Sequence, residues 1–393
     1  MSDFGTRMSP SLATEATLDV PSSETKVEHQ LQILLDHAAL IADERRLPRL
    51  IELIRDMGKA VARADRCSVW VLDWEYDELY TVASEGIDQV RIPSNAGLQG
   101  LALTEGQPIL IKDAHADPRF DSESDGRTGY RTRSMMVLPF WDNNGEPLGC
   151  FQVVNKITPD AVFSESDLRL MGLVASYAGK ALESAMLNQE VEQTQRELLL
   201  KLGEVCESRS KDTGQHVRRV ADYSYVLALK IGLPEQDAEL LKMVSPMHDV
   251  GKVSIPDSIL NKPGKLSEED FALMKLHTIV GYDIFKGSKG RVMSSAAIVA
   301  WQHHEKWNGT GYPRGISGEQ IHIFARITAV ADVFDALASE RVYKRAWPID
   351  KVMKLFEEER GKHFDPQLVD ALVACLPDIL EIREQLNDPP GFF

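Results

Sequence analysis

Residues 245–252 read Ser-Pro-Met-His-Asp-Val-Gly-Lys, and the adjacent His248 and Asp249 decide how the second half of the chain is interpreted. On both sides of this stretch helical patterns alternate with short loops, and strand patterns are sparse. We therefore expect an all-α bundle beyond Lys211, in which several helices can direct side chains at one interior point. The expected helices span 214–231, 235–250, 267–276, 294–304, 324–339 and 350–359.

Histidine and aspartate recur around this pair at about the length of one helix plus one loop. His216 precedes the pair, and His277, His303-His304 and Asp332 follow it. Imidazole nitrogens and carboxylate oxygens suit iron, manganese, zinc or nickel. Two metals about 3.5–4 Å apart, which one aspartate can bridge, activate water and stabilise a phosphodiester transition state. Isolated histidines are more often ordinary core or surface residues, and that interpretation applies to His29, His37, His115, His322 and His363.

A glycine-rich loop, WNGTGYPRGISGEQI at residues 307–321, follows the histidine pair directly. Its glycines let the backbone approach a ligand closely. Tyr312 offers a ring for stacking, and Arg314 can pair with phosphate. The loop is therefore expected to form the rim of a substrate site.

Residues 205–370 resemble the HD-GYP family, a bacterial branch of the HD-type metal-dependent phosphohydrolases. The resemblance implies a helical bundle with two or three divalent metal ions, often iron or manganese. It also implies hydrolysis of cyclic di-GMP to pGpG or onward to GMP. The segments that carry it are Asp212-Thr213-Gly214-Gln215-His216, His248-Asp249-Val250-Gly251-Lys252, His277, His303-His304-Glu305, Gly309-Thr310-Gly311-Tyr312-Pro313 and Asp332-Val333-Phe334-Asp335-Ala336-Leu337.

The resemblance implies a role for each matched residue. Asp249 would be the bridging, catalytic carboxylate, and Lys252 would be catalytic and would face the scissile phosphate. Asp212 stands where trinuclear members typically carry glutamate, so both two and three metals stay open. The metal ligands would be Asp212, His216, His248, Asp249, His277, His303, His304 and Asp332. The substrate contacts would be Lys252, Gly311, Tyr312, Pro313, Arg314, Arg341 and Lys344.

The first half of the chain has a different pattern. Residues 1–26, rich in Ser, Thr and Glu, are typical of a disordered tail. Helical stripes are then followed by strand patterns, and Asn144-Gly145 between two apolar runs signals a hairpin, so an α+β domain with an antiparallel sheet is expected.

Residues 27–187 resemble a GAF domain, a small-molecule sensing module. The resemblance rests on residues 97–120 and 134–156 and on Phe163 and Asp167. It implies a cyclic nucleotide or another small molecule as ligand, or partner binding and dimerisation without one. Lys156 and Asp167 are expected to form a structural salt bridge.

Residues 163–209 read as one long helix, capped by Ser164 with Asp167 three residues on. The segment 167–209 would link the sensor to an HD-GYP domain at 205–393 and transmit its signal. A heptad seam along it favours a parallel coiled coil and a homodimer formed by this helix and the GAF domain, and the alternative is a helix packed on its own domains. The seam contains Val174, Tyr177, Ala181, Ser184, Asn188, Val191, Gln195, Leu198, Leu202 and Val205.

Composition limits the remaining choices. The 393 residues carry a net charge of −16, which opposes binding of nucleic-acid polymers. The four cysteines form no CxxC pair, and neither a signal peptide nor a membrane span is visible, so a cytoplasmic protein is expected.

The leading functional hypothesis is a metal-dependent cyclic di-GMP phosphodiesterase that the GAF domain regulates. Three alternatives remain. One is a cyclic dinucleotide receptor that signals through partners such as a diguanylate cyclase. The others are a phosphodiesterase for cyclic GMP-AMP and an HD phosphohydrolase that acts on a mononucleotide.

Overall fold

A computed structural model describes residues 23–81, 90–122, 125, 129–210, 214–340 and 346–387. The chain divides into an N-terminal unit, Met1–Glu190, and a C-terminal unit, Val191–Phe393. The expected disordered tail, 1–26, lies mostly outside the described residues, and the first helix begins at Ser23. No helix in the described part of the chain combines the length and the apolar character needed to cross a membrane.

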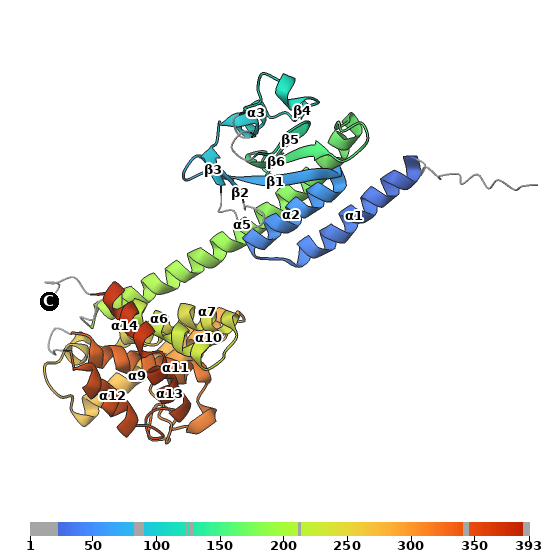
Figure 1. Ribbon diagram of the computed structural model, residues 1–393. Coiled ribbons are helices and arrows are strands. Elements are labelled where there is room, and N and C mark those ends of the chain that lie inside the picture. The colour runs from blue at the N-terminus through green and yellow to red at the C-terminus, as the bar shows by residue number, and fades with distance from the viewer. Residues whose placement is uncertain are drawn as a thin grey trace, which may run out of the picture. The chain divides into compact units, whose positions relative to one another are not determined.

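The N-terminal unit is a six-stranded sheet with helices on its faces (Figure 1). The sheet order is β3-β2-β1-β6-β5-β4, and each neighbouring pair is antiparallel. The expected α+β domain is therefore confirmed. Its elements are α1 (Ser23–Asp43), α2 (Leu47–Ala62), β1 (Ala64–Asp73), β2 (Glu78–Thr81), β3 (Val90–Pro93), α3 (Gly97–Glu105), β4 (Ile109–Ile111), η1 (Ala114–Ala116), β5 (Met135–Trp141) and β6 (Pro147–Lys156).

The hairpin between β5 and β6 forms where the sequence signals it. The carboxylate of Asp142 accepts hydrogen bonds from the backbone N–H groups of Asn144 and Glu146, both at 2.8 Å. Gly145 takes a φ of 87°, a left-handed conformation that costs glycine little. This turn sets the register in which Leu138 lies opposite Phe151.

Side chains alternate between the two faces of the sheet, as the period of a strand requires. Val69 and Val71 of β1 belong to the core on the face that α2 and α5 (Glu165–Ser208) cover. Trp70 and Leu72 belong to the core on the face that α3 covers. The sheet is therefore buried on both faces.

Helix α5 is the long helix expected from the sequence, and it continues from the N-terminal unit into the C-terminal one. Its start is a reciprocal cap, in which Ser164 N–H donates to Asp167 Oδ2 at 2.9 Å and Asp167 N–H donates to Ser164 Oγ at 3.2 Å. Asp167 also pairs with Lys156, at 2.5 Å between Oδ1 and Nζ, so the expected salt bridge is present.

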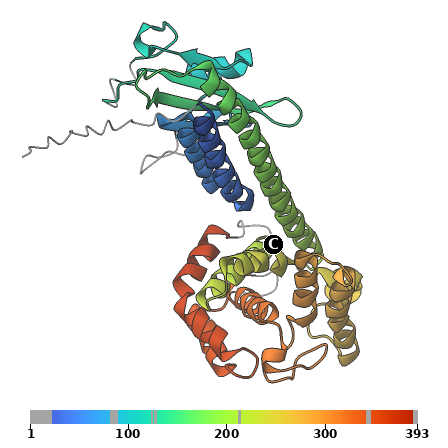
Figure 2. The same ribbon diagram turned by 90° about the vertical axis from the view of Figure 1, so that its right-hand side faces the viewer.

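Within 214–340 and 346–387, every regular element of the C-terminal unit is a helix (Figure 2). Their shared core contains Tyr223, Leu241, Phe334 and Phe356. The elements are α6 (Gly214–Lys230), α7 (Glu235–Val244), η2 (Ser245–Met247), η3 (Val250–Ser254), α8 (Asp257–Leu260), α9 (Glu268–Phe285), α10 (Arg291–Gln302), η4 (Gly318–Gln320), α11 (Ile323–Ala338), α12 (Ile349–Glu358), α13 (Pro366–Ala374) and α14 (Leu376–Gln385).

Two helix ends were expected wrongly. The helix expected over 267–276 continues to Phe285 as α9, and it therefore includes His277. The sequence predicts a helix over 235–250, but α7 ends at Val244 and two short 3₁₀ turns, η2 and η3, follow it. Pro246 explains the break, because proline has no N–H for the helix ladder and its ring clashes with the preceding turn. His248 and Asp249 therefore lie between two turns rather than inside a helix.

Candidate metal centre

The turn that carries His248 and Asp249 is packed directly against the backbone of α9. A Cβ atom on Gly251 would lie 1.9 Å from the carbonyl oxygen of His277 and 2.6 Å from the backbone nitrogen of Gly281. Only glycine fits such a contact. This close approach brings the side chain of His277 beside Asp249.

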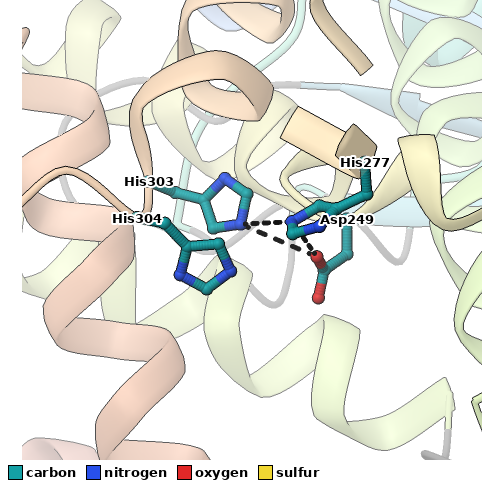
Figure 3. A group of neighbouring side chains, drawn as sticks. All are labelled: Asp249, His277, His303 and His304. Atoms are coloured by element: carbon teal, nitrogen blue, oxygen red, sulfur yellow. Dashed lines mark hydrogen bonds and ion pairs between the residues drawn. The ribbon is translucent and has the colours of Figure 1, made fainter. Parts of the chain in front are cut away.

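A first group of side chains consists of Asp249, His277, His303 and His304, whose ligand atoms lie within 4.8 Å of one another. Asp249 Oδ1 is 3.2 Å from His277 Nε2 and 3.6 Å from His303 Nε2. The two imidazole nitrogens are 3.4 Å apart. Figure 3 shows these rings converging on the carboxylate from two different helices, α9 and the end of α10.

A second group consists of His216, His248 and Asp332. Asp332 Oδ1 lies 3.6 Å from His216 Nε2 and 4.0 Å from His248 Nε2. Asp249 joins the two groups, because its Oδ2 is 3.3 Å from His248 Nε2 while its Oδ1 faces the first group. This is the placement expected of a carboxylate shared between two metals.

Backbone carbonyls orient the histidine rings of both groups. Nδ1 of His248 lies 2.8 Å from the oxygen of Ser245, and Nδ1 of His277 lies 2.7 Å from that of Met274. Because a carbonyl only accepts, these contacts place the ring proton on Nδ1. Nε2 then directs its lone pair at the centre, as metal-binding histidines in proteins do.

His216 is oriented by a carboxylate instead. Asp335 Oδ2 lies 2.7 Å from His216 Nδ1, and Asp335 Oδ1 accepts a hydrogen bond from Arg219 Nε at 2.6 Å. Burial by itself would raise the pKa of Asp335, but His216 and Arg219 hold it well below its usual value. Burial would lower the pKa of His216, and Asp335 reverses that effect.

The buried polar atoms at the centre fit a metal ion. His248 Nε2 and Asp249 Oδ1 are enclosed, and neither has a hydrogen-bond partner among the described residues. Buried polar atoms without partners are costly unless a ligand satisfies them. The donor set of imidazoles and carboxylates suits a divalent transition metal.

The pKa shifts in the first group are consistent with this, whereas in the second group burial would lower the pKa of His248 but Asp249 raises it to about 9. Burial lowers the pKa of His277 to about 4, and burial with the neighbouring His303 lowers the pKa of His304 well below its usual value. Burial would raise the pKa of Asp249, but Lys252 and His248 hold it well below the usual range. At His277 and His304, neutral imidazoles beside the ionised Asp249 are the protonation states that bind metal.

Lys252 is held between two carboxylates. Its Nζ lies 2.6 Å from Asp249 Oδ2 and 3.1 Å from Glu207 Oε1. Glu207 is 1% exposed and, with His248 and Asp249, forms a third group whose ligand atoms lie within 4.8 Å of one another.

The loop at 307–321 lies against the histidine pair. A Cβ atom on Gly311 would lie 2.3 Å from the backbone nitrogen of Lys306, so the loop needs glycine there. The backbone N–H of Arg314 donates a hydrogen bond to Glu305 Oε1 at 2.7 Å, and this bond fixes the middle of the loop. The ring of Tyr312 is 4.8 Å from that of His304, and a cis peptide bond joins Tyr312 to Pro313.

The structure brings together seven of the eight residues expected as metal ligands. The eighth, Asp212, lies outside the described residues, as do Arg341 and Lys344.

Among the expected substrate contacts, Arg314 has its guanidinium over the ring of Trp301, at 4.7 Å.

Sequence reasoning assigned no role to Glu207, Asp335 or Glu305. Asp335 follows Asp332 by three residues, a spacing that places both on one helix face, so a signal was present. Glu207 carried no such signal, because one glutamate near the end of a charged helix reads as solvated surface.

Family comparisons agree with both units. Residues 46–182 match the model described as GAF domain, and residues 202–368 match the model described as HD domain. The chain joins a GAF domain to an HD domain. Both matches agree with the GAF and HD-type resemblances of the sequence motifs.

Two relatives carry names that state an activity. The 3'3'-cGAMP-specific phosphodiesterase 2 of Vibrio cholerae is 43% identical over 225 residues, which cover 57% of this chain and 43% of that protein. The cyclic di-GMP phosphodiesterase response regulator RpfG of Xanthomonas campestris is 44% identical over 198 residues, which cover 50% and 52%. The chain thus spans about half the length of these relatives.

A solved structure is similar to part of the chain. The GAF domain of a phosphoenolpyruvate-protein phosphotransferase from Coxiella burnetii is 20% identical and has a TM-score of 0.37. The match covers 42% of this chain and 98% of that one.

A cavity of about 330 Å³ opens in the GAF domain between β5 and α5. Its lining includes Leu138 and Trp141 of β5 and Leu168, Gly172 and Lys180 of α5. The volume is in the range of small-molecule sites in proteins.

Proposed function

We propose that the chain is a metal-dependent phosphodiesterase that hydrolyses cyclic di-GMP under the control of its GAF domain. The observation that carries this proposal is the pair of histidine–aspartate groups sharing Asp249, with Lys252 Nζ 2.6 Å from that carboxylate. The names of the two relatives above support a cyclic dinucleotide as the substrate class.

The chain's own residues supply most of the expected site. One metal would be held by Asp249, His277, His303 and His304, and another by His216, His248, Asp249 and Asp332. Divalent ions bound there, with iron and manganese as the expected metals, would supply Lewis-acid activation of water and neutralisation of phosphate charge. A third ion, which would favour onward cleavage to GMP, depends on carboxylates such as Asp212.

Lys252 would act directly at the phosphate, and Asp249 would hold the metals beside it. The ammonium of Lys252 is 15% exposed at its side chain, so it can leave Asp249 and bind a phosphoryl oxygen as negative charge develops there. Asp249 would remain ionised throughout as a metal ligand, and overall the proton that water loses would end on the leaving 3′-oxygen. Glu305 would keep the Tyr312 loop against the histidines.

A wall of aromatic and cationic groups next to Tyr312 suits a purine base. The rings of Phe271 and Tyr312 are 6.1 Å apart, edge to face, and Lys275 Nζ lies 4.7 Å from the Phe271 ring and 5.3 Å from the Tyr312 ring. Phe271 is 43% exposed although it is fully apolar. Nucleobases stack on such rings, which supports a nucleotide over a simple phosphodiester.

Cyclic GMP-AMP is the second candidate substrate, because the 43% identical relative is named for it. The test incubates the chain with each dinucleotide and Mn²⁺ or Fe²⁺, and products are resolved chromatographically. The expected result is a metal-dependent conversion that His248→Ala and Asp249→Ala abolish. Retained nucleotide binding without turnover under either metal would instead support the receptor hypothesis.

Self-association through α5 would link the sensor to the enzyme. Within the expected seam, Val174 is fully buried in its own domain and Tyr177 donates to the oxygen of Ala38 at 2.9 Å, so this part packs on the GAF fold. Farther along, Val191, Leu198, Leu202 and Val205 are each more than half exposed at heptad spacing. A parallel two-stranded coiled coil with a second copy would cover them.

A further inference from the structure

The end of α5 contacts the turn that carries Lys252. The carboxylate of Glu207, in the last turn of that helix, lies 3.1 Å and 3.4 Å from Lys252 Nζ through its two oxygens. Ser210 Oγ donates to Glu207 Oε2 at 2.9 Å, which fixes the rotation of the carboxylate. The side chain of Lys252 is thus placed by a residue of α5 as well as by Asp249.

The backbone of the same turn is held by Arg209. Its guanidinium donates to the carbonyl oxygens of Lys252 at 2.9 Å, Val253 at 2.7 Å and Ile255 at 3.0 Å. A fourth bond, at 2.9 Å, goes to the carboxylate of Asp257 at the start of α8. The planar donor set of arginine suits several acceptors at once, whereas lysine cannot reproduce it.

The end of α5 is also seated rigidly in the HD domain. A Cβ atom on Gly203 would lie 2.8 Å from the oxygen of Pro246, two residues before His248. Leu199 and Cys206, on the same side of the helix, are buried in the core of the HD domain. The helix therefore contacts the chain on both sides of the His248-Asp249 pair, and it cannot shift without moving the Lys252 turn.

We propose that Glu207 and Arg209 form a clamp through which α5 positions Lys252 beside Asp249. Both are positioning residues, since they act on the reaction through the lysine. The inference rests on the proposed function, because it takes Lys252 to face the scissile phosphate. The helix that leaves the GAF domain thus ends in contact with the catalytic lysine. A displacement of α5 would therefore change kcat more than KM.

The test uses the full chain loaded with Mn²⁺ and the variants Glu207→Gln, Glu207→Asp and Arg209→Lys. Glu204→Gln is the matched control, because Glu204 lies one turn earlier on α5 and pairs with Lys201 and Arg218. Steady-state kinetics with cyclic di-GMP, kinetics with bis(p-nitrophenyl) phosphate and metal content are measured for each variant.

We expect Glu207→Gln to lower kcat by 10-fold or more with KM within about twofold, Glu207→Asp to recover part of that loss, and the control to match the parent chain. Metal content should stay at the parent value. Unchanged kcat in Glu207→Gln overturns the proposal. A loss of bound metal in proportion to activity also overturns it, because Glu207 would then be a ligand.

Hydrogen exchange of residues 250–257, followed by mass spectrometry, reports on the clamp without any substrate. Arg209→Lys should speed exchange in this segment, and Glu204→Gln should leave it unchanged. If the parent chain cleaves neither phosphodiester, the proposed function fails while exchange still decides whether the clamp exists. Exchange in Arg209→Lys equal to that of the parent would show that no clamp holds the turn.

Discussion

Replacing Asp335 by asparagine removes a charge from an enclosed ion-pair network in the HD domain. Asp335 is 1% exposed and pairs with His216 Nδ1 at 2.7 Å and with Arg219 Nε at 2.6 Å. Asparagine has nearly the same volume, so the packing is preserved and the perturbation is electrostatic. The change removes the carboxylate charge that faces the buried guanidinium of Arg219 at both Nε and Nη2.

The expected loss of stability is large. Removing one partner of a buried ion pair costs about 3–5 kcal/mol. For a unit of about 200 residues each kcal/mol lowers Tm by roughly 2–4 °C, so the HD transition should fall by roughly 6–20 °C. Losing the carboxylate that orients a metal-binding histidine should also weaken metal binding by about 10–100-fold.

Calorimetry of the full chain in chelator, followed by titration with Mn²⁺, measures both effects. Asp370→Asn is the control, because Asp370 is exposed and pairs with Arg360. An exposed pair contributes only about 0–1 kcal/mol, so the control should shift Tm by at most a few degrees. An Asp335→Asn chain that melts like the control and binds Mn²⁺ within threefold of the parent would refute the reasoning.

Gly251→Ala should destabilise the HD domain by about 1–3 kcal/mol or more in urea unfolding, because its Cβ would overlap the oxygen of His277. Gly172→Ala, whose Cβ meets nothing within 4 Å, should not destabilise the chain in this way. Removing metal with a chelator should lower the melting temperature of the HD domain in calorimetry, because the candidate ligands lie in that domain. The melting temperature of the GAF domain should not change, and equal shifts in both would contradict this. Leu198→Glu should convert the proposed dimer to a monomer in light scattering, since it places charge in the exposed seam of α5. Glu197→Gln should leave the mass unchanged, and a parent chain that is itself monomeric would contradict the proposed dimer. Phe271→Ala should raise KM for cyclic di-GMP about 5-fold or more and leave cleavage of bis(p-nitrophenyl) phosphate unaltered, because stacking on an aromatic ring contributes about 1–3 kcal/mol per base.

Much of the fold was readable because the decisive features are local. The Asn144-Gly145 turn, the cap at Ser164 and the helical periodicity of 165–208 each follow from residues close together in the sequence. The helix expected across His248 was wrong because the hydrophobic period was followed past Pro246, whose missing donor ends α7.

The sequence predicts those residues of the candidate site whose types and spacing are unusual in proteins. Histidines spaced by helix and loop stand out, and the structure gathers them around Asp249; that they hold metal stays a prediction. Glu207 could not be found in this way. Its burial depends on how α5 packs against the Lys252 turn, and no local pattern encodes a contact between residues so far apart in sequence.

The contact between Gly251 and the backbone of α9 means that main-chain packing sets the positions of side chains in the centre. Asp249 and His277 are held at their separation by a peptide group pressed on a glycine rather than by adjustable side chains. Substitutions of His303 or His304 would therefore leave the separation of Asp249 and His277 unchanged. A side chain larger than hydrogen at Gly251 would instead push apart the two segments that carry Asp249 and His277.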